Sequence, residues 1–124
     1  MEKYFVVFVG AGIGGLLRFL TGVWLTAWYR GRFPLGTFAV NVTGSFLVGL
    51  LVAFLTERAP DHPYWRLFFV VGLLGGYTTF STFELELFQA ARETERALAF
   101  LYALASVTVG YLAVWLGALL GSRR

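Results

Sequence analysis

The stretch Gly75-Gly76-Tyr77-Thr78-Thr79-Phe80 lies inside an apolar segment that runs from about residue 64 to residue 91. A segment of this length can cross a membrane as a helix, for which about 20 apolar residues suffice. Glycine and β-branched threonine are poor helix formers, so their presence here predicts a helix break near the middle of the membrane. The alternative is a simple kink whose free carbonyl groups are satisfied by Thr and Ser hydroxyls.

A break of this kind would free backbone carbonyl groups where water is scarce. Inside a bilayer such groups need protein, water or a cation as a partner. A cluster made only of oxygen atoms suits a hard ion rather than a transition metal. If the break lay on a two-fold axis, two chains would supply their carbonyls to one site.

Three further apolar segments cover approximately residues 4–29, 33–56 and 97–120. Hydrophobic residues make up 58% of the 124 residues and charged residues only 14%, which leaves too few polar side chains to cover a water-soluble core. All the connections are short, so neighbouring spans alternate in direction. The sequence therefore predicts an all-α membrane protein, a single domain of four transmembrane helices over residues 1–124, with the third helix broken.

The positive charges are almost equally divided between the two sides of the membrane. One side carries Lys3, Arg58, Arg66, Arg123 and Arg124, and the other carries Arg30, Arg32, Arg92 and Arg96. Five against four assigns no orientation by the positive-inside rule. One interpretation is a single, weakly biased orientation. The other is dual topology, in which copies inserted both ways pair as an antiparallel dimer.

Several polar residues lie inside the spans. Arg18 is about 11 residues from the nearer end of its span, roughly 16 Å along the helix, so it must face water or protein. A charge at mid-span costs about 2.5 to 3.5 kcal/mol on insertion scales, which favours a functional role over a purely structural one. Thr37, Asn41 and Ser45 fall at steps of four and share one helix face. Hydrogen bonds between helices and a pore lining are both open interpretations of this face.

Two phenylalanines follow the predicted break. Phe80 and Phe83 are three residues apart and share a face, which in most proteins indicates core packing. Glu86 is expected at an aqueous mouth rather than in lipid. In the fourth span Tyr102 and Ser106 again step by four and add hydroxyl groups to one face.

Three motifs together resemble the bacterial fluoride channels called the Fluc or CrcB family. They are Gly12-Ile13-Gly14-Gly15-Leu16-Leu17-Arg18-Phe19, Gly36-Thr37-Phe38-Ala39-Val40-Asn41-Val42-Thr43-Gly44-Ser45-Phe46 and Gly75-Gly76-Tyr77-Thr78-Thr79-Phe80-Ser81-Thr82-Phe83-Glu84. The second and third motifs are the specific ones, because substitutions among apolar residues would not produce their pattern of polar residues. The resemblance extends over all four spans.

The resemblance implies a fluoride-selective passive channel in the cell inner membrane, formed by an antiparallel, dual-topology homodimer with two pores. It implies that the carbonyl groups of Gly75 and Thr78 from both chains hold a structural sodium ion at the dimer centre. It also implies that Arg18 makes the vestibule electropositive. The remaining residues expected along the fluoride path are Asn41, Phe80, Phe83, Thr37, Ser81, Tyr102 and Ser106.

Other functions fit the sequence less well. A small multidrug-type, proton-coupled exporter shares the size and dimeric state, but it would be expected to carry an acidic residue inside the first span, where none is present. An enzyme is not expected, because the single histidine, His62, lies in a loop without a nucleophile motif and there are no cysteines. Nucleic acid is not an expected partner, because the ten Lys and Arg residues are scattered.

Overall fold

The chain folds into four long apolar helices, the third of which is interrupted. The computed structural model describes residues 1–62, 64–92 and 95–122. Its elements are α1 (Glu2–Trp28), α2 (Leu35–Arg58), η1 (Arg66–Leu74), α3 (Gly75–Tyr77), α4 (Phe80–Arg92) and α5 (Arg96–Gly121). Each of the four helical segments is long and apolar enough to cross a membrane. The prediction of a multi-pass, all-helical membrane protein is confirmed. Arg123 and Arg124, which entered the charge balance, lie outside the described residues.

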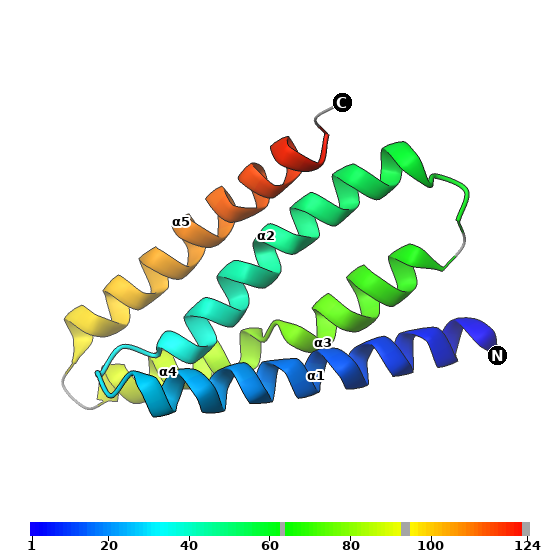
Figure 1. The fold of residues 1–124 in the computed structure, drawn as a ribbon. Helices are drawn as coiled ribbons and strands as arrows, with labels where there is room; N and C mark the ends of the chain where they lie inside the picture. Colours follow the sequence, from blue (N-terminus) through cyan, green and yellow to red (C-terminus); the bar gives the residue numbers. More distant parts are fainter. Residues whose placement is uncertain (63, 93–94, 123–124) are drawn as a thin grey trace.

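The helices pack as two pairs, each pair made of helices that run in the same direction, and the two pairs run in opposite directions. Figure 1 shows α2 beside α5, and η1 with α3 beside α1. The start of α1 and the end of α5 lie toward the same end of the bundle, as expected when four spans alternate in direction (Figure 1). Large apolar side chains cover much of the outer surface, including Phe8, Trp24 and Tyr111, which are each at least 68% exposed. Such a surface is stable in lipid rather than in water.

Glycines allow the paired helices to approach each other closely. A Cβ atom added at Gly14 would lie 2.0 Å from the Leu73 carbonyl oxygen, and one added at Gly76 would lie 2.5 Å from the Ala11 carbonyl oxygen. In the other pair, a Cβ at Gly117 would lie 2.1 Å from the Phe46 carbonyl oxygen. Because the clashing atoms belong to the backbone, a side chain could be accommodated only by separating the helices.

The third helix is interrupted at its threonines rather than at its glycines. Gly75 and Gly76 are helical, whereas Thr78 is extended, with φ −80° and ψ 156°. The segment before the break, η1, has the wider π-helical form, which the sequence did not indicate. The interruption was therefore predicted correctly in its existence. Of the two glycines only Gly76 allows a close approach to α1, because a Cβ at Gly75 would meet no described atom closer than the Val70 carbonyl oxygen, at 3.7 Å.

The interruption changes the partner of the third helix. Before it, η1 and α3 contact α1 and α2; after it, α4 contacts α5 and α2. Since α4 turns away from α1, a hollow opens between α1, α2 and α4, with Arg18 and Thr79 in its lining. The hollow beside the break is therefore lined by polar residues of the spans, among them Arg18 and Thr79.

Candidate functional site

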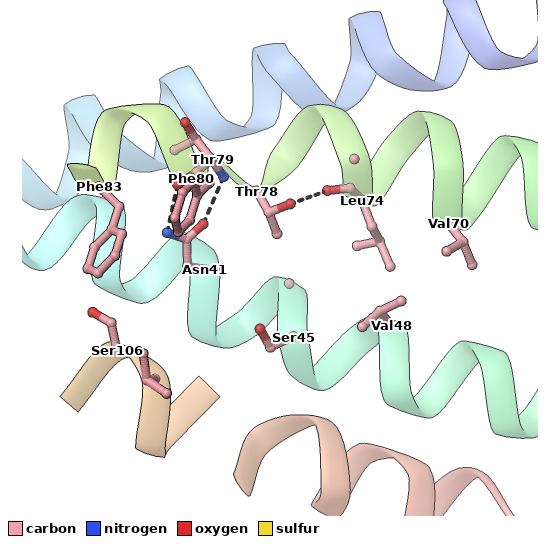
Figure 2. A pocket seen from close by; sticks show the side chains of 13 residues that line it. Asn41, Ser45, Val48, Val70, Leu74, Thr78, Thr79, Phe80, Phe83 and Ser106 are labelled. Atoms are coloured by element: carbon pink, nitrogen blue, oxygen red, sulfur yellow. Dashed lines mark hydrogen bonds between the residues drawn. The ribbon is translucent and has the colours of Figure 1, made fainter. Parts of the chain in front are cut away.

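The site is built around the backbone at the break, which the side chain of Asn41 holds through two hydrogen bonds. Asn41 Nδ2 donates to the Thr79 carbonyl at 2.9 Å, and the Thr79 N–H donates to Asn41 Oδ1 at 2.8 Å. The Asn41 side chain therefore makes the same pair of hydrogen bonds with the Thr79 backbone that a residue of a neighbouring β-strand would make. Figure 2 shows both bonds between α2 and the start of α4. One N–H of the Asn41 amide is left for another acceptor.

Beside this clamp lies a cavity of about 390 Å³. Its described lining consists of apolar, hydroxyl and amide groups and contains no charged side chain. The residues are Asn41, Gly44, Ser45, Val48, Val70, Leu74, Gly75, Thr78, Thr79, Phe80, Phe83, Ser106 and Val107. The cavity thus brings together predicted path residues from three helices with the two predicted cation ligands.

Aromatic rings form one wall of this cavity. The ring centroids of Phe80 and Phe83 are 5.8 Å apart, and Phe83 meets Tyr102 edge to face at 5.0 Å. Phe83 is buried, whereas Phe80 is 74% exposed. The ring edges carry partial positive charge, so an exposed edge is available to an anion.

Ser106 presents a buried hydroxyl without a protein partner. Its Oγ is the only such side-chain atom among the described residues that make up the structure. Figure 2 shows Ser106 on α5, on the side of the cavity where Phe83 lies. A buried donor without an acceptor is costly unless a bound ion or water completes it, so this hydroxyl indicates an occupant.

Replacing Ser106 with Ala tests whether that hydroxyl serves an occupant. Because the hydroxyl has no protein partner, we expect an unchanged or higher thermal unfolding midpoint. Ion flux should nevertheless fall by about fivefold, the factor for one typical hydrogen bond. Ser122→Ala, just after the end of α5, is the control for flux: it removes an exposed hydroxyl that donates to the Leu119 carbonyl at 3.2 Å, and flux should stay normal. A lower midpoint with normal flux would mean that Ser106 only supports packing.

Arg18 also contacts the break, but it is not among the described residues that line this cavity. Its Nη1 donates to the Thr78 carbonyl at 3.1 Å. The guanidinium also lines the hollow of about 330 Å³ between α1, α2 and α4, together with Thr37 and Thr82. Among the described residues of that lining Arg18 is the one that carries a charge, so it makes the hollow electropositive.

Thr37 and Tyr102 both donate to Glu86. Thr37 Oγ1 reaches one carboxylate oxygen and the Tyr102 hydroxyl reaches the other, each at 2.8 Å. Since a hydroxyl has one proton, neither group has a donor left for an anion in this arrangement. Their predicted place on the path stays a prediction that requires Glu86 to move. The sequence placed Glu86 at an aqueous mouth, but it gave no sign that this carboxylate joins the two hydroxyls.

Two other predicted or missed residues lie near the break. Ser81 is exposed on α4, and its Oγ is 3.5 Å from Thr79 Oγ1. Thr79 itself, which the sequence analysis did not single out, is only 8% exposed and caps the first turn of α4, because the Thr82 N–H donates to its hydroxyl at 3.3 Å. A Thr directly before a helical segment was the signal that could have identified it.

At the end of the bundle near Glu86, a salt bridge joins two connections. Arg32, before α2, pairs with Glu95, before α5, at 2.5 Å. Arg32 also lines a hollow of about 380 Å³ that contains Thr37 and Glu86. This hollow has Thr37 in common with the one that holds Arg18, so the two adjoin each other toward the end of the bundle.

The sequence is similar to known proteins over almost its whole length. Residues 5–118 match the profile of a family described as "CrcB-like protein, Camphor Resistance (CrcB)". The "Fluoride-specific ion channel FluC" of Solibacter usitatus is 52% identical over 121 residues, 98% of this chain and 99% of that protein. The proteins of the same name from Acidobacterium capsulatum and Hydrogenobaculum sp. are 46% and 42% identical, over 98% and 96% of this chain and 97% of each relative. The similarity extends over all four helices.

Proposed function

We propose that this chain, which belongs to the CrcB-like family, is a passive, fluoride-selective channel that lets fluoride leave the cell and so reduces its toxicity. The relatives named as fluoride-specific ion channels match nearly the whole chain. The structural observation that carries the proposal is the buried, unpartnered Ser106 hydroxyl, which lines the same cavity as the Asn41 amide and Phe80.

The chemistry of this lining suits fluoride. Fluoride is small and strongly hydrated, so a channel must replace its water with hydrogen-bond donors. The free N–H of Asn41, the Ser106 hydroxyl and the ring edge of Phe80 are donors of graded strength. The ring edge binds an anion only weakly, which allows the ion to leave as well as to enter. A carboxylate in the lining would repel the ion, and the described lining has none.

Passive conduction fits the distribution of acidic residues. Proton-coupled export would need a titratable acid within the spans that alternates between proton and substrate. The sequence of α1 has no acid after Glu2, which is in its first turn. On α4, Glu86 is held by the hydroxyls of Thr37 and Tyr102, and Glu84 is exposed. The fluoride gradient and the membrane potential are therefore the driving forces that we propose.

The working unit that we propose is an antiparallel homodimer. Phe80 and Val107, which both line the cavity, are 74% and 69% exposed, so one side of the cavity is open in the single chain. A second copy would close that side and add its own lining residues. The near-equal positive charge at the two ends supports insertion in both directions, and an inverted copy makes an isologous, two-fold contact.

The carbonyl groups of Gly75 and Thr78 fit a sodium ion at the centre of this dimer. Among the described residues, no group of three or more His, Cys, Asp or Glu side chains is placed to hold a metal, so a cation would be bound by backbone oxygens. Gly75 is exposed beside the open cavity, and a Cβ there would meet only the Val70 carbonyl within 4 Å. Two such carbonyls from each chain would give four oxygen ligands.

Growth in fluoride tests the proposed function in cells. Expression of the chain in a fluoride-sensitive bacterial host should raise the fluoride concentration that permits growth. It should leave tolerance of added chloride unchanged. A host that gains no tolerance, although the protein is present in its membrane, would contradict a role in fluoride export.

Orientation can be tested because the chain has no cysteine. A single Ser122→Cys substitution places a thiol at the carboxyl end of α5. In a dual-topology protein, a membrane-impermeant maleimide should label about half of the molecules in intact cells, and the rest only after permeabilisation. Labelling of all or of none of the molecules in intact cells would instead show one orientation and exclude the antiparallel dimer.

A further inference from the structure

Two backbone N–H groups at the break donate to side chains rather than to backbone carbonyls. In a continuous α-helix the Thr79 N–H would donate to the Gly75 carbonyl. Here it donates to Asn41 Oδ1 at 2.8 Å. Likewise the Thr82 N–H, which would donate to the Thr78 carbonyl in a helix, donates to Thr79 Oγ1 at 3.3 Å. The carbonyls of Gly75 and Thr78 are therefore two of those that lose their helical donors, and they are the two whose donors are taken by side chains.

The Thr79 hydroxyl is oriented so that its oxygen can accept the hydrogen bond from the Thr82 N–H. Its side chain is buried, and its Oγ1 donates to Thr82 Oγ1 at 3.1 Å. With its proton directed there, a lone pair of Thr79 Oγ1 is available to the Thr82 N–H, which gives an N-cap on α4. The cap stabilises the interrupted form over a continuous helix, because only in the interrupted form is this donor satisfied by the side chain.

The Thr78 carbonyl keeps room for a second partner. Thr78 is extended, and its carbonyl accepts one hydrogen bond from Arg18 at 3.1 Å. A carbonyl oxygen has two lone pairs, so one remains. Its own N–H and its hydroxyl both donate to the Leu74 carbonyl, at 3.0 and 2.9 Å, which anchors Thr78 to the preceding turn.

We propose that Asn41 and Thr79 are positioning residues for the cation site, because each removes from one of its two carbonyls the N–H that would otherwise occupy it. This inference rests on the proposed dimer with its central cation. It assigns Asn41 to both the ion path and the cation site, and it gives the buried Thr79 a role that the ion path does not require. Cation binding and the lining of the cavity then depend on the same interrupted backbone.

The test uses Thr79, since Asn41 also lines the proposed path. The thermal unfolding midpoint of the purified full-length protein in detergent is measured as sodium replaces N-methylglucamine at constant ionic strength. Thr79→Val keeps the shape of the side chain and removes the hydroxyl. We expect a rise of about fivefold in the sodium concentration that gives half of the maximal increase in the unfolding midpoint. Fivefold corresponds to the loss of a typical helix cap.

Two comparisons separate positioning from general destabilisation. Thr79→Ser keeps the hydroxyl and should stay within about twofold of the unchanged protein. Thr56→Val makes the same chemical change on an exposed residue near the end of α2 and should not alter the sodium dependence. If Thr79→Val does not fold, Thr79→Ala against Thr79→Ser isolates the hydroxyl at equal loss of the methyl group.

The outcomes distinguish the positioning role of Thr79 from the cation site and from the channel function. A sodium dependence shifted in the variants without the hydroxyl, and kept in Thr79→Ser, supports the positioning role. A sodium dependence equal in Thr79→Val and the unchanged protein overturns it while leaving the cation site in place. If the unchanged protein shows no sodium dependence but still conducts fluoride, both the cation site and this inference are wrong, and the channel function stands.

Discussion

Replacing Asn41 with Asp is expected to reduce fluoride flux by roughly a thousandfold. A carboxylate at this position would face an anion in a cavity whose described lining has no cation. Two like charges about 4 Å apart repel by about 4 kcal/mol at an effective dielectric constant near 20, and about 1.4 kcal/mol corresponds to a factor of ten. The carboxylate would also repel the Thr79 carbonyl, which now accepts from Asn41 Nδ2 at 2.9 Å.

Fluoride release from liposomes, followed with a fluoride electrode, measures this effect. Gln89→Glu is the matched control, because it makes the same amide-to-carboxylate change on an exposed residue of α4. It should conduct normally. Size-exclusion chromatography shows whether the Asn41→Asp protein keeps its oligomeric state. Undiminished flux through a correctly assembled Asn41→Asp protein would show that the ion path avoids this residue.

Replacing Gly14 with Val is expected to prevent the protein from folding. The first atom of the new side chain would lie 2.0 Å from the Leu73 carbonyl oxygen and 2.8 Å from the Tyr77 nitrogen, so α1 would have to move away from η1 and α3. Overpacking of a core costs typically about 1 to 3 kcal/mol when side chains can yield. Here the clashing atoms are backbone, so we expect more than that.

The yield of monodisperse protein in detergent measures the effect of Gly14→Val. Gly12→Val is the control on the same helix, because a Cβ at Gly12 meets no heavy atom within 4 Å. We expect Gly12→Val to be recovered as the unchanged protein is. Equal recovery of both variants would mean that the close approach of α1 to η1 is not needed for folding.

The four helices could be predicted because lipid constrains a sequence more strongly than water does. A span must be apolar along most of its length and must end in polar turns, and the described helix ends agree with the expected ones within a few residues. The existence of the break could also be predicted, from glycine and β-branched residues in one apolar segment. Its position could not, because a glycine can serve either flexibility or close packing, and only the neighbouring α1 shows that Gly76 is needed for close packing.

The partners of the polar residues could not be predicted from local spacing. Hydrogen bonds between helices were one of the two interpretations of the face that holds Asn41, yet the sequence does not show that Thr79, far along the chain, supplies both the acceptor and the donor for its amide. The same holds for Glu86, whose two partners lie on α2 and α5. These contacts depend on how the helices pack, and helical periodicity describes only one helix at a time.

Ion selectivity in liposomes tests the channel function most directly. Vesicles that contain purified protein are loaded with fluoride or with chloride, and a potassium ionophore removes the membrane potential that would otherwise stop anion efflux. We predict rapid release of fluoride and retention of chloride, with no dependence on a proton gradient. Equal release of the two anions, or fluoride release only when a proton gradient is imposed, would contradict a passive, fluoride-selective channel.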